Sequence, residues 1–329
     1  MTGVSLYSQL AEHIGHAHSR YIPQIFEILA NEKEAILLLA AKAPASATVL
    51  SKNTGFHETE INEMIKKLFY KGLIYKSKKT DGIKYYCVRN VIQFHDATLV
   101  VDNPDQRMLD LWKQYDHEEW PDYFRQLCEF FPTPPVRVIP INESLDAGTR
   151  VMPFDDITKA VDNAYNLAVT KCSCRVVHGE CGHPVDVCIQ VNKAADYAIE
   201  RGTGRQIDKT EAVEILKMCS ERGLVHNATN HKSVGMIICN CCEDCCENWP
   251  GGRRFISPSR FLASVSENKC TLCEECIDRC IFDAISFDQE EGIIHISEDD
   301  CMGCGVCKTG CQEEAIKLIE IRPPDHIPN

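Results

Sequence analysis

The sequence predicts an α+β protein of several domains, and three features support this fold class. Amphipathic segments followed by a strand pair occupy the N-terminal part, ten of the twenty cysteines lie between Cys172 and Cys246, and one cysteine pattern occurs twice after Lys269. A chain of 329 residues is long enough for two or three domains with cores of their own. We expect the domain boundaries to delimit residues 1–100, 101–168, 169–250 and 251–329.

The N-terminal domain is predicted to begin with helices. Asn31 and Glu34 have the spacing of a capping box, which opens a helix that stops at Pro44. A short helix is expected at residues 46–52 and a longer one at 57–71, where apolar residues recur at the spacing of a single buried stripe.

A hairpin is predicted to complete this domain. Gly72 ends the preceding helix, and strands at residues 73–75 and 83–88 flank the turn Lys78–Gly82. Cys87 then lies in the second strand as a small buried side chain. The order of helix, short helix, helix and hairpin resembles the winged-helix domain of bacterial regulators.

The charges of this domain bear on two alternative functions, nucleic-acid binding and docking to a partner protein. Between Lys52 and Arg89 there are nine Lys or Arg and four acids, a local charge of +5, although the whole chain carries −13. The helix that would read DNA begins with acids, which repel phosphate. We therefore favour docking to a partner protein over nucleic-acid binding. The acids are Glu58, Glu60 and Glu63, and the lysines of the expected wing are Lys76, Lys78, Lys79 and Lys84.

Residues 101–168 are expected to form a helical linker region. Pro104 to Phe130 is amphipathic and aromatic, typical of one or two helices, with Cys128 buried and inert. The proline-rich stretch 131–140 is predicted to be an extended connector between domains.

Residues 169–250 are predicted to hold a metal. Adjacent cysteines make poor disulfides, zinc needs only four ligands, and the surplus of soft thiolates favours an additional iron–sulfur cluster, with structural zinc as the alternative. Cys219 is expected to be structural, and Arg175 and Arg205 either to offset thiolate charge or to form surface ion pairs. The candidate ligands are Cys172, Cys174, Cys181, Cys188, Cys239, Cys241, Cys242, Cys245 and Cys246.

The order of the predicted elements within residues 169–250 also bears on the fold. A helix at 209–222, Gly223 and two strands ending at Ile238 repeat the helix–glycine–hairpin order of the N-terminal domain, which suggests a second unit of that kind. Gly202–Arg205 lacks the glycines and the preceding strand of a nucleotide-binding loop. The motifs CxCR and ICNCC loosely resemble those of multi-cluster iron–sulfur proteins of anaerobic bacteria.

The most informative stretch contains the pattern C-x2-C-x2-C-x3-C twice, 31 residues apart. The fourth cysteine of each run sits one helical turn beyond the third and points away from its own loop. One cluster is therefore expected on Cys270, Cys273, Cys276 and Cys311, and the other on Cys301, Cys304, Cys307 and Cys280.

Residues 260–322 resemble bacterial ferredoxins with two [4Fe–4S] clusters, which implies a ferredoxin-like domain whose first strand is Phe261–Val265. Ile281 and Gln312 stand where that family usually has proline. Because these positions are not ligands, the departure bears on local rigidity and reduction potential.

These features predict a cytoplasmic electron-transfer protein, or an electron-transfer subunit, that serves a partner oxidoreductase. We expect no catalysis by the chain itself, because no pattern of acid, base or nucleophile occurs. The first residues lack a secretory signal, and no apolar run is long enough to span a bilayer. So many thiols suit a reducing setting, such as the cytoplasm of an anaerobe. The alternative is a redox-sensing regulator that binds DNA.

Overall fold

The computed structural model describes residues 4–80, 82–146 and 150–329, without the side chains of residues 79 and 250–252. The chain is a mixture of helices and strands and divides into two compact units. Unit 1 comprises residues 1–123, 176–178 and 201–203, and unit 2 the remainder. Asp81 of the expected hairpin turn, the Lys79 side chain and residues 1–3 lie outside the described part.

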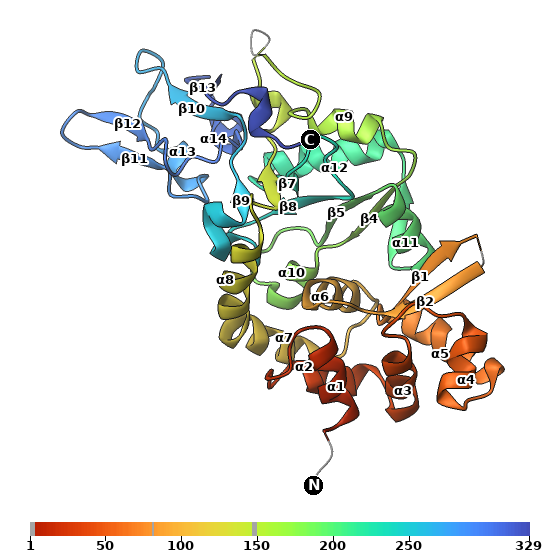
Figure 1. The fold of residues 1–329 in the computed structure, drawn as a ribbon. Coiled ribbons are helices and arrows are strands. Elements are labelled where there is room, and N and C mark those ends of the chain that lie inside the picture. The colour runs from red at the N-terminus through yellow and green to blue at the C-terminus, as the bar shows by residue number, and fades with distance from the viewer. Residues whose placement is uncertain (1–3, 81, 147–149) are drawn as a thin grey trace. The chain divides into compact units, whose positions relative to one another are not determined.

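Unit 1 is mainly helical (Figure 1). Its elements are α1 (Leu6–His13), α2 (Ile22–Leu29), α3 (Glu32–Ala40), α4 (Ala47–Thr54), α5 (Glu58–Tyr70), β1 (Ile74–Lys79), β2 (Gly82–Cys87), α6 (Val91–Leu99) and α7 (Gln106–Glu118). The capping box of Asn31 and Glu34 is confirmed at the start of α3. The apolar stripe of α5 is buried, and Gly72 follows α5 with a φ of +79°.

Unit 2 contains a seven-stranded sheet in the order β6-β4-β5-β8-β7-β3-β9, antiparallel except for the β3–β9 pair. Helix α12 packs on this sheet, with α9 beside it, over an apolar core. The strands are β3 (Val136–Val138), β4 (Leu167–Lys171), β5 (Asp186–Val191), β6 (Gly204–Ile207), β7 (Val225–Thr229), β8 (Ile237–Cys241) and β9 (Ile256–Ser257). The helices within unit 2 are α9 (Ile157–Asp162) and α12 (Lys209–Glu221), with 3-10 turns at Asn142–Ser144, Trp249–Arg254 and Pro324–His326. Three further helices have residues in both units: α8 (Trp120–Phe130), α10 (Ser173–His178) and α11 (Lys193–Arg201).

The rest of unit 2 is the repeat segment, residues 261–320, at the upper left of Figure 1. It consists of β10 (Phe261–Val265), α13 (Glu275–Asp278), β11 (Ile285–Asp288), β12 (Ile293–Ile296), α14 (Val306–Gly310) and β13 (Ile316–Glu320). The expected strand Phe261–Val265 is confirmed as β10.

Two expectations for unit 2 need correction. The proline-rich stretch is not only a connector, because Val136–Val138 forms β3 between β7 and β9. The expected helix–glycine–hairpin order exists in α12, Gly223, β7 and β8, but β8 begins at Ile237 and also pairs with β5. The hairpin therefore belongs to the large sheet, where a second partner strand covers its edge.

No described helix combines the length and the apolar character that crossing a membrane requires.

Candidate metal centres

The two halves of the repeat segment interlock. Strand β10 of the first half pairs with β13 of the second, and β11 of the first half pairs with β12 of the second. Helices α13 and α14 contact each other between these pairs (Figure 1). The last cysteine of each run is therefore carried toward the cysteines of the other half.

The cysteines of this segment form two groups that match the crossed assignment. Cys270, Cys273, Cys276 and Cys311 line one cavity of about 330 Å³. Burial raises the pKa of Cys276 to about 11, and the charges of the other three thiols add to this shift. Positive metal ions would relieve this mutual repulsion.

The second group consists of Cys280, Cys301, Cys304 and Cys307. Burial raises the pKa of Cys304 to about 12, with further contributions from Cys301 and Cys280. The pKa of Cys307 is raised well above its ordinary value, first by burial, then by the charges of Cys304, Cys301 and Cys280, and last by Cys276 of the first group. Each group thus takes three cysteines from one run and the fourth from the other.

The backbone of the two cysteine loops repeats as closely as the cysteines. Leu272 and Glu274 have φ values of +58° and +62°, and the residues 31 positions later, Gly303 and Gly305, have +65° and +83°. Alternation with left-handed residues turns successive backbone N–H groups toward one side, which creates a concave site for an anion or an iron–sulfur cluster. Both loops therefore suit a negatively charged cluster.

Packing explains why only the second loop uses glycine. A Cβ on Gly303 would lie 2.1 Å from the Phe261 carbonyl oxygen, and one on Gly305 would lie 2.1 Å from Ser144 Oγ. In the first loop Leu272 is 41% exposed and Cys273 is exposed. One thiol group thus borders the surface, whereas the other is enclosed.

The middle segment, residues 167–246, gathers six thiols in a row. Cys172 follows β4, Cys188 lies in β5, and Cys239 and Cys241 lie in β8, so that three neighbouring strands bring them together. The register that pairs Ile189 with Ile238 places Cys188 next to Cys239. We call this set the six-thiol row; its neighbours contact in the order Cys174, Cys172, Cys188, Cys239, Cys241 and Cys246.

Hydrogen bonds along this row favour thiolates at two positions. Bonds from Cys174 and Cys188 lower the pKa of Cys172 well below its usual value. Bonds from Cys188 and Cys241 lower the pKa of Cys239 to about 6. The same row raises the pKa of Cys174, Cys188, Cys241 and Cys246 well above its usual value. Two of the six thiols therefore favour the thiolate, which is the form that binds soft metal ions.

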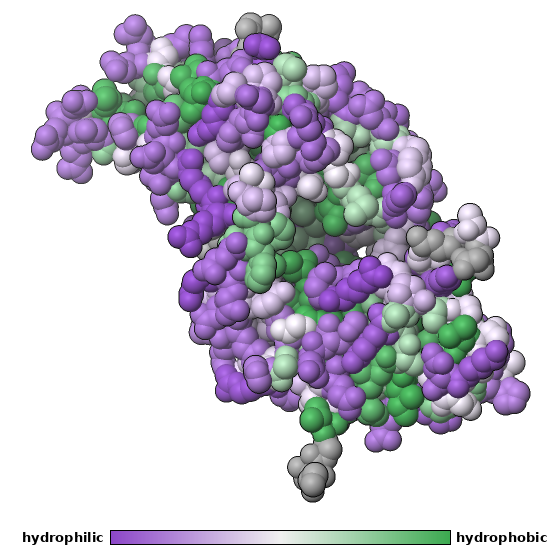
Figure 2. Space-filling model, in the orientation of Figure 1, coloured by the Kyte–Doolittle hydropathy of each residue, from purple (hydrophilic) through white to green (hydrophobic). Residues whose placement is uncertain are grey.

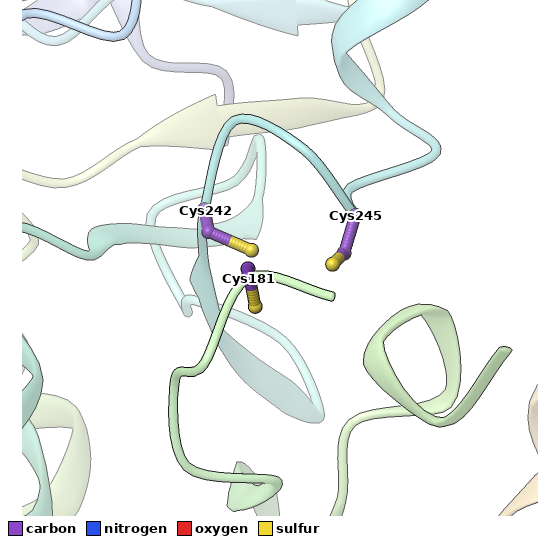
Figure 3. Close-up of side chains that lie close together, drawn as sticks. All are labelled: Cys181, Cys242 and Cys245. Carbon is purple, nitrogen blue, oxygen red and sulfur yellow. The ribbon is translucent and has the colours of Figure 1, made fainter. Parts of the chain in front are cut away.

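The remaining three candidates form a separate three-thiol group of Cys181, Cys242 and Cys245, whose sulfur atoms lie within 4.8 Å of one another (Figure 3). Both adjacent cysteine pairs divide between the two sets: Cys241 and Cys246 join the row, and their neighbours Cys242 and Cys245 join the three-thiol group. At Cys241, the last residue of β8, successive side chains point to opposite sides of the strand, whereas Cys245 lies in the turn that follows. The sequence predicts a single site for all nine cysteines, and the structure separates them into two sets.

A buried polar network supports the strand between the two sets. Asn240 is fully buried; its Nδ2 donates to the Val187 carbonyl (2.6 Å), and its Oδ1 lies 2.6 Å from His226 Nδ1. Since Oδ1 can only accept, the proton of neutral His226 is on Nδ1. Burial lowers the pKa of His226 to about 4. Sequence reasoning missed both residues, because no local spacing marks them.

The other residues considered in the sequence lie in ordinary structural settings. Arg205 forms an exposed ion pair with Glu211 at 2.5 Å. A Cβ on Gly204 would lie 2.7 Å from that of Ala198, so this glycine permits close packing. Cys87 and Cys219 are buried, and burial raises the pKa of each to about 12.

Comparison with protein-family models, with curated proteins and with solved structures finds no match for this chain.

Proposed function

We propose that this chain is an iron–sulfur electron-transfer protein that serves a partner oxidoreductase. The observation that carries this proposal is the pair of crossed cysteine groups in the repeat segment, each with three thiols from one run and one from the other. Crossing of the fourth cysteine is the pattern of ferredoxins with two [4Fe–4S] clusters. When bound, such clusters accept and release single electrons.

The residues proposed to hold one cluster are Cys270, Cys273, Cys276 and Cys311; those proposed for the other are Cys301, Cys304, Cys307 and Cys280. Backbone N–H groups next to these thiols would stabilise their charged form. Ala315 N–H donates to Cys311 Sγ at 3.3 Å, and Phe282 and Ala284 donate to Cys280. Donors of this kind tune the reduction potential of a cluster.

The six-thiol row is proposed to hold an additional iron–sulfur centre. Asn227 supports this assignment: it is 1% exposed, and neither its Oδ1 nor its Nδ2 has a partner among the described residues. Its register partner on β8 is Cys239, so the two side chains lie on the same face of the sheet. A bound group in the row would supply the hydrogen-bond partner that this buried amide lacks within the described chain.

The repeat segment offers a surface for a redox partner. Residues 261–320 contain fourteen acids and four Lys or Arg, a net charge of −10. Glu274, Glu275 and Glu313 line the cavity beside the exposed Cys273. The face shown in Figure 2 is mostly hydrophilic over this segment, with a few apolar residues. These features favour a partner with a basic docking surface.

The winged-helix-like part of unit 1 is proposed to bind protein rather than DNA. Helix α5 opens with acids: Glu60 pairs with Lys33 at 2.6 Å, and Glu58 accepts a hydrogen bond from Thr48. A helix that presents this terminus to the major groove would repel phosphate. Salt-sensitive, sequence-specific retardation of promoter DNA would instead support a redox-sensing regulator.

The test is anaerobic purification and reconstitution, followed by iron and sulfide analysis and by EPR after reduction. We expect at least about eight iron atoms per chain, four for each of two clusters, together with a cubane signal. Cys276→Ser is expected to lower both the iron content and the cubane EPR signal. Cys87→Ser, which alters a buried thiol far in sequence from the two cysteine runs, is expected to leave both unchanged. Less iron than this, or no reducible cubane signal, would contradict the proposal.

A further inference from the structure

The three-thiol group has a different geometry from the groups proposed for clusters. Cys242 and Cys245 lie at the two ends of the loop that follows β8, and Cys181 comes from the separate segment after α10 (Figure 3). Gly179, in the left-handed conformation at the end of α10, turns the chain toward this position. Three thiols from two segments thus meet at one point.

The sulfur separations fit one metal ion. Tetrahedral thiolate ligands about 2.3 Å from zinc stand roughly 3.8 Å from each other, and these three sulfur atoms lie within 4.8 Å of one another. In a four-iron cluster each thiolate binds a different iron, which holds the thiolates further apart. Among the described residues, no cysteine of the repeat segment belongs to such a tight trio.

Backbone donors already support charge on these thiols. The N–H of His183 donates to Cys181. Cys245 N–H donates to Cys242 in the same way. Donors to ligand sulfurs orient and stabilise metal-bound thiolates.

A buried cation beside the group needs a negative charge. Arg175 is 2% exposed, and its guanidinium donates to the carbonyl oxygens of Pro184 and Asn240 and, at 3.3 Å, to Cys242 Sγ. Among the described residues its Nε has no partner, and the groups that favour its charge are the thiols of Cys242, Cys172 and Cys181 rather than a carboxylate. An isolated buried charge is costly. Three thiolates and one divalent ion carry a net charge of −1, which Arg175 neutralises.

We propose that Cys181, Cys242 and Cys245 bind a single zinc ion, distinct from the centre of the six-thiol row. The ion ties the loop after α10 to the loop after β8 and leaves its fourth position to a ligand other than cysteine. Arg175 holds Cys242 toward this ion, while the adjacent Cys241 points into the row. The inference stands independently of electron transfer, because it concerns only these three thiols and Arg175.

The test is metal analysis of the full-length protein purified without oxygen and without added zinc. The expected result is one zinc per chain in addition to the iron. Replacement of zinc by cobalt(II) is expected to give the visible bands of a tetrahedral ion and the near-ultraviolet bands of thiolate ligation. Both measurements, the zinc content and the cobalt(II) spectrum, are made on the unaltered chain, so neither depends on whether a variant folds.

Variants then identify the ligands. Cys245→Ser is expected to lose the zinc and the cobalt bands while iron, sulfide and the cubane EPR signal stay unchanged. Cys219→Ser is the matched control, since Cys219 is buried in the same apolar cluster but belongs to neither thiol group. Absence of stoichiometric zinc, or loss of iron and sulfide instead of zinc from Cys245→Ser, overturns the inference. A missing cubane signal in the unaltered chain would contradict only the proposed electron transfer.

Discussion

The repeat segment and the middle segment both assemble thiols, but they do so by different means. In the repeat segment three thiols of each group come from one short run, and Cys311 and Cys280 cross over to the other group. In the middle segment the order and register of β4, β5 and β8 bring Cys172, Cys188, Cys239 and Cys241 together, and the loops beside these strands add the other thiols. The first arrangement depends on loop conformation, and the second depends on a sheet.

This difference determines where each region is sensitive to substitution. A cysteine loop is damaged where its backbone must be left-handed or must pass close to another segment. A sheet-borne site is damaged where a buried polar contact keeps neighbouring strands in place. The following predictions test these two sensitivities in turn.

The largest effect is expected for Gly303→Ala. The added Cβ would lie 2.1 Å from the Phe261 carbonyl oxygen, at a φ of +65°, so the loop must move. We expect a loss of stability of at least about 3 kcal/mol and loss of the cluster proposed on Cys301, Cys304, Cys307 and Cys280. Anaerobic urea denaturation and iron analysis measure the two effects.

Leu272→Ala is the control for this prediction. Leu272 occupies the equivalent backbone position in the first loop with a φ of +58°, but its side chain is 41% exposed. Its replacement is expected to change stability by less than about 1 kcal/mol and to leave the iron content unchanged. If Gly303→Ala and Leu272→Ala lost equal amounts of iron, the packing of the second loop would not be the property that distinguishes the two loops.

The next largest effect is expected for Asn240→Leu in the middle segment. The substitution leaves the Val187 carbonyl and His226 Nδ1 without partners in a buried place, at a cost of about 2–4 kcal/mol. We expect the six-thiol row to lose metal while the clusters of the repeat segment persist. Iron analysis combined with EPR separates the two.

Gln190→Leu provides a comparison on the adjacent strand β5. Its half-buried amide donates a hydrogen bond to Thr170 Oγ1 at 3.1 Å. We expect a cost within about 1 kcal/mol and full metal content. If it were as damaging as Asn240→Leu, the special role assigned to the Asn240 contacts would be wrong.

Much of the repeat segment follows from local sequence. The spacing within each run and the offset of 31 residues predict the helical turn between the third and fourth cysteines and the crossed groups, and the resemblance to ferredoxins implies the strand Phe261–Val265. The asymmetry between the loops is not predicted. A Cβ at Gly303 would meet the Phe261 carbonyl, which is a long-range contact, whereas Leu272 is 41% exposed.

The middle segment could be predicted only as a list of ligands. The sequence predicts α12 and the two strands after it. It does not predict β4, β5 and β6, because no clear side-chain periodicity marks these strands between the cysteines. Which thiols meet depends on strand order, which the sequence does not reveal. The adjacent pair at the end of β8, Cys241 and Cys242, carries a signal that the thiols divide, because neighbouring side chains in extended chain point to opposite faces.

A smaller effect is expected from pH through His226. Burial lowers its pKa to about 4 in the folded chain, against about 6.5 unfolded. The unfolded state therefore binds the proton first, and stability falls as pH drops from above 6.5 toward 4. Between pH 7 and pH 5 this group should account for about 2 kcal/mol of the loss.

Anaerobic urea titrations at several pH values measure this contribution. His226→Gln, which cannot titrate, is expected to lower stability at pH 7 but to reduce the slope with pH. His231→Gln, at a more exposed position in the following turn, is expected to retain the slope of the unaltered chain. A slope that is the same in all three proteins would exclude His226 as its source.

The smallest effect is expected for Asn227→Leu. Its buried amide has no partner among the described residues and shares a sheet face with Cys239. If Nδ2 donates to a thiolate or sulfide of the proposed centre, its loss removes a bond that favours the reduced, more negative state. One hydrogen bond of about 1 kcal/mol corresponds to roughly 40 mV for one electron, so the potential should fall by that amount.

The direction of the change in potential shows whether the Asn227 amide faces a bound group or is only buried. Without a bound group, removal of an unsatisfied amide should stabilise the fold or leave it unchanged and should not alter any potential. Redox titration followed by EPR should show the shift in the middle centre alone, because the repeat segment holds its own donors, such as Ala315 N–H on Cys311. A shift confined to the ferredoxin-type signals would instead place the partner of Asn227 outside the six-thiol row.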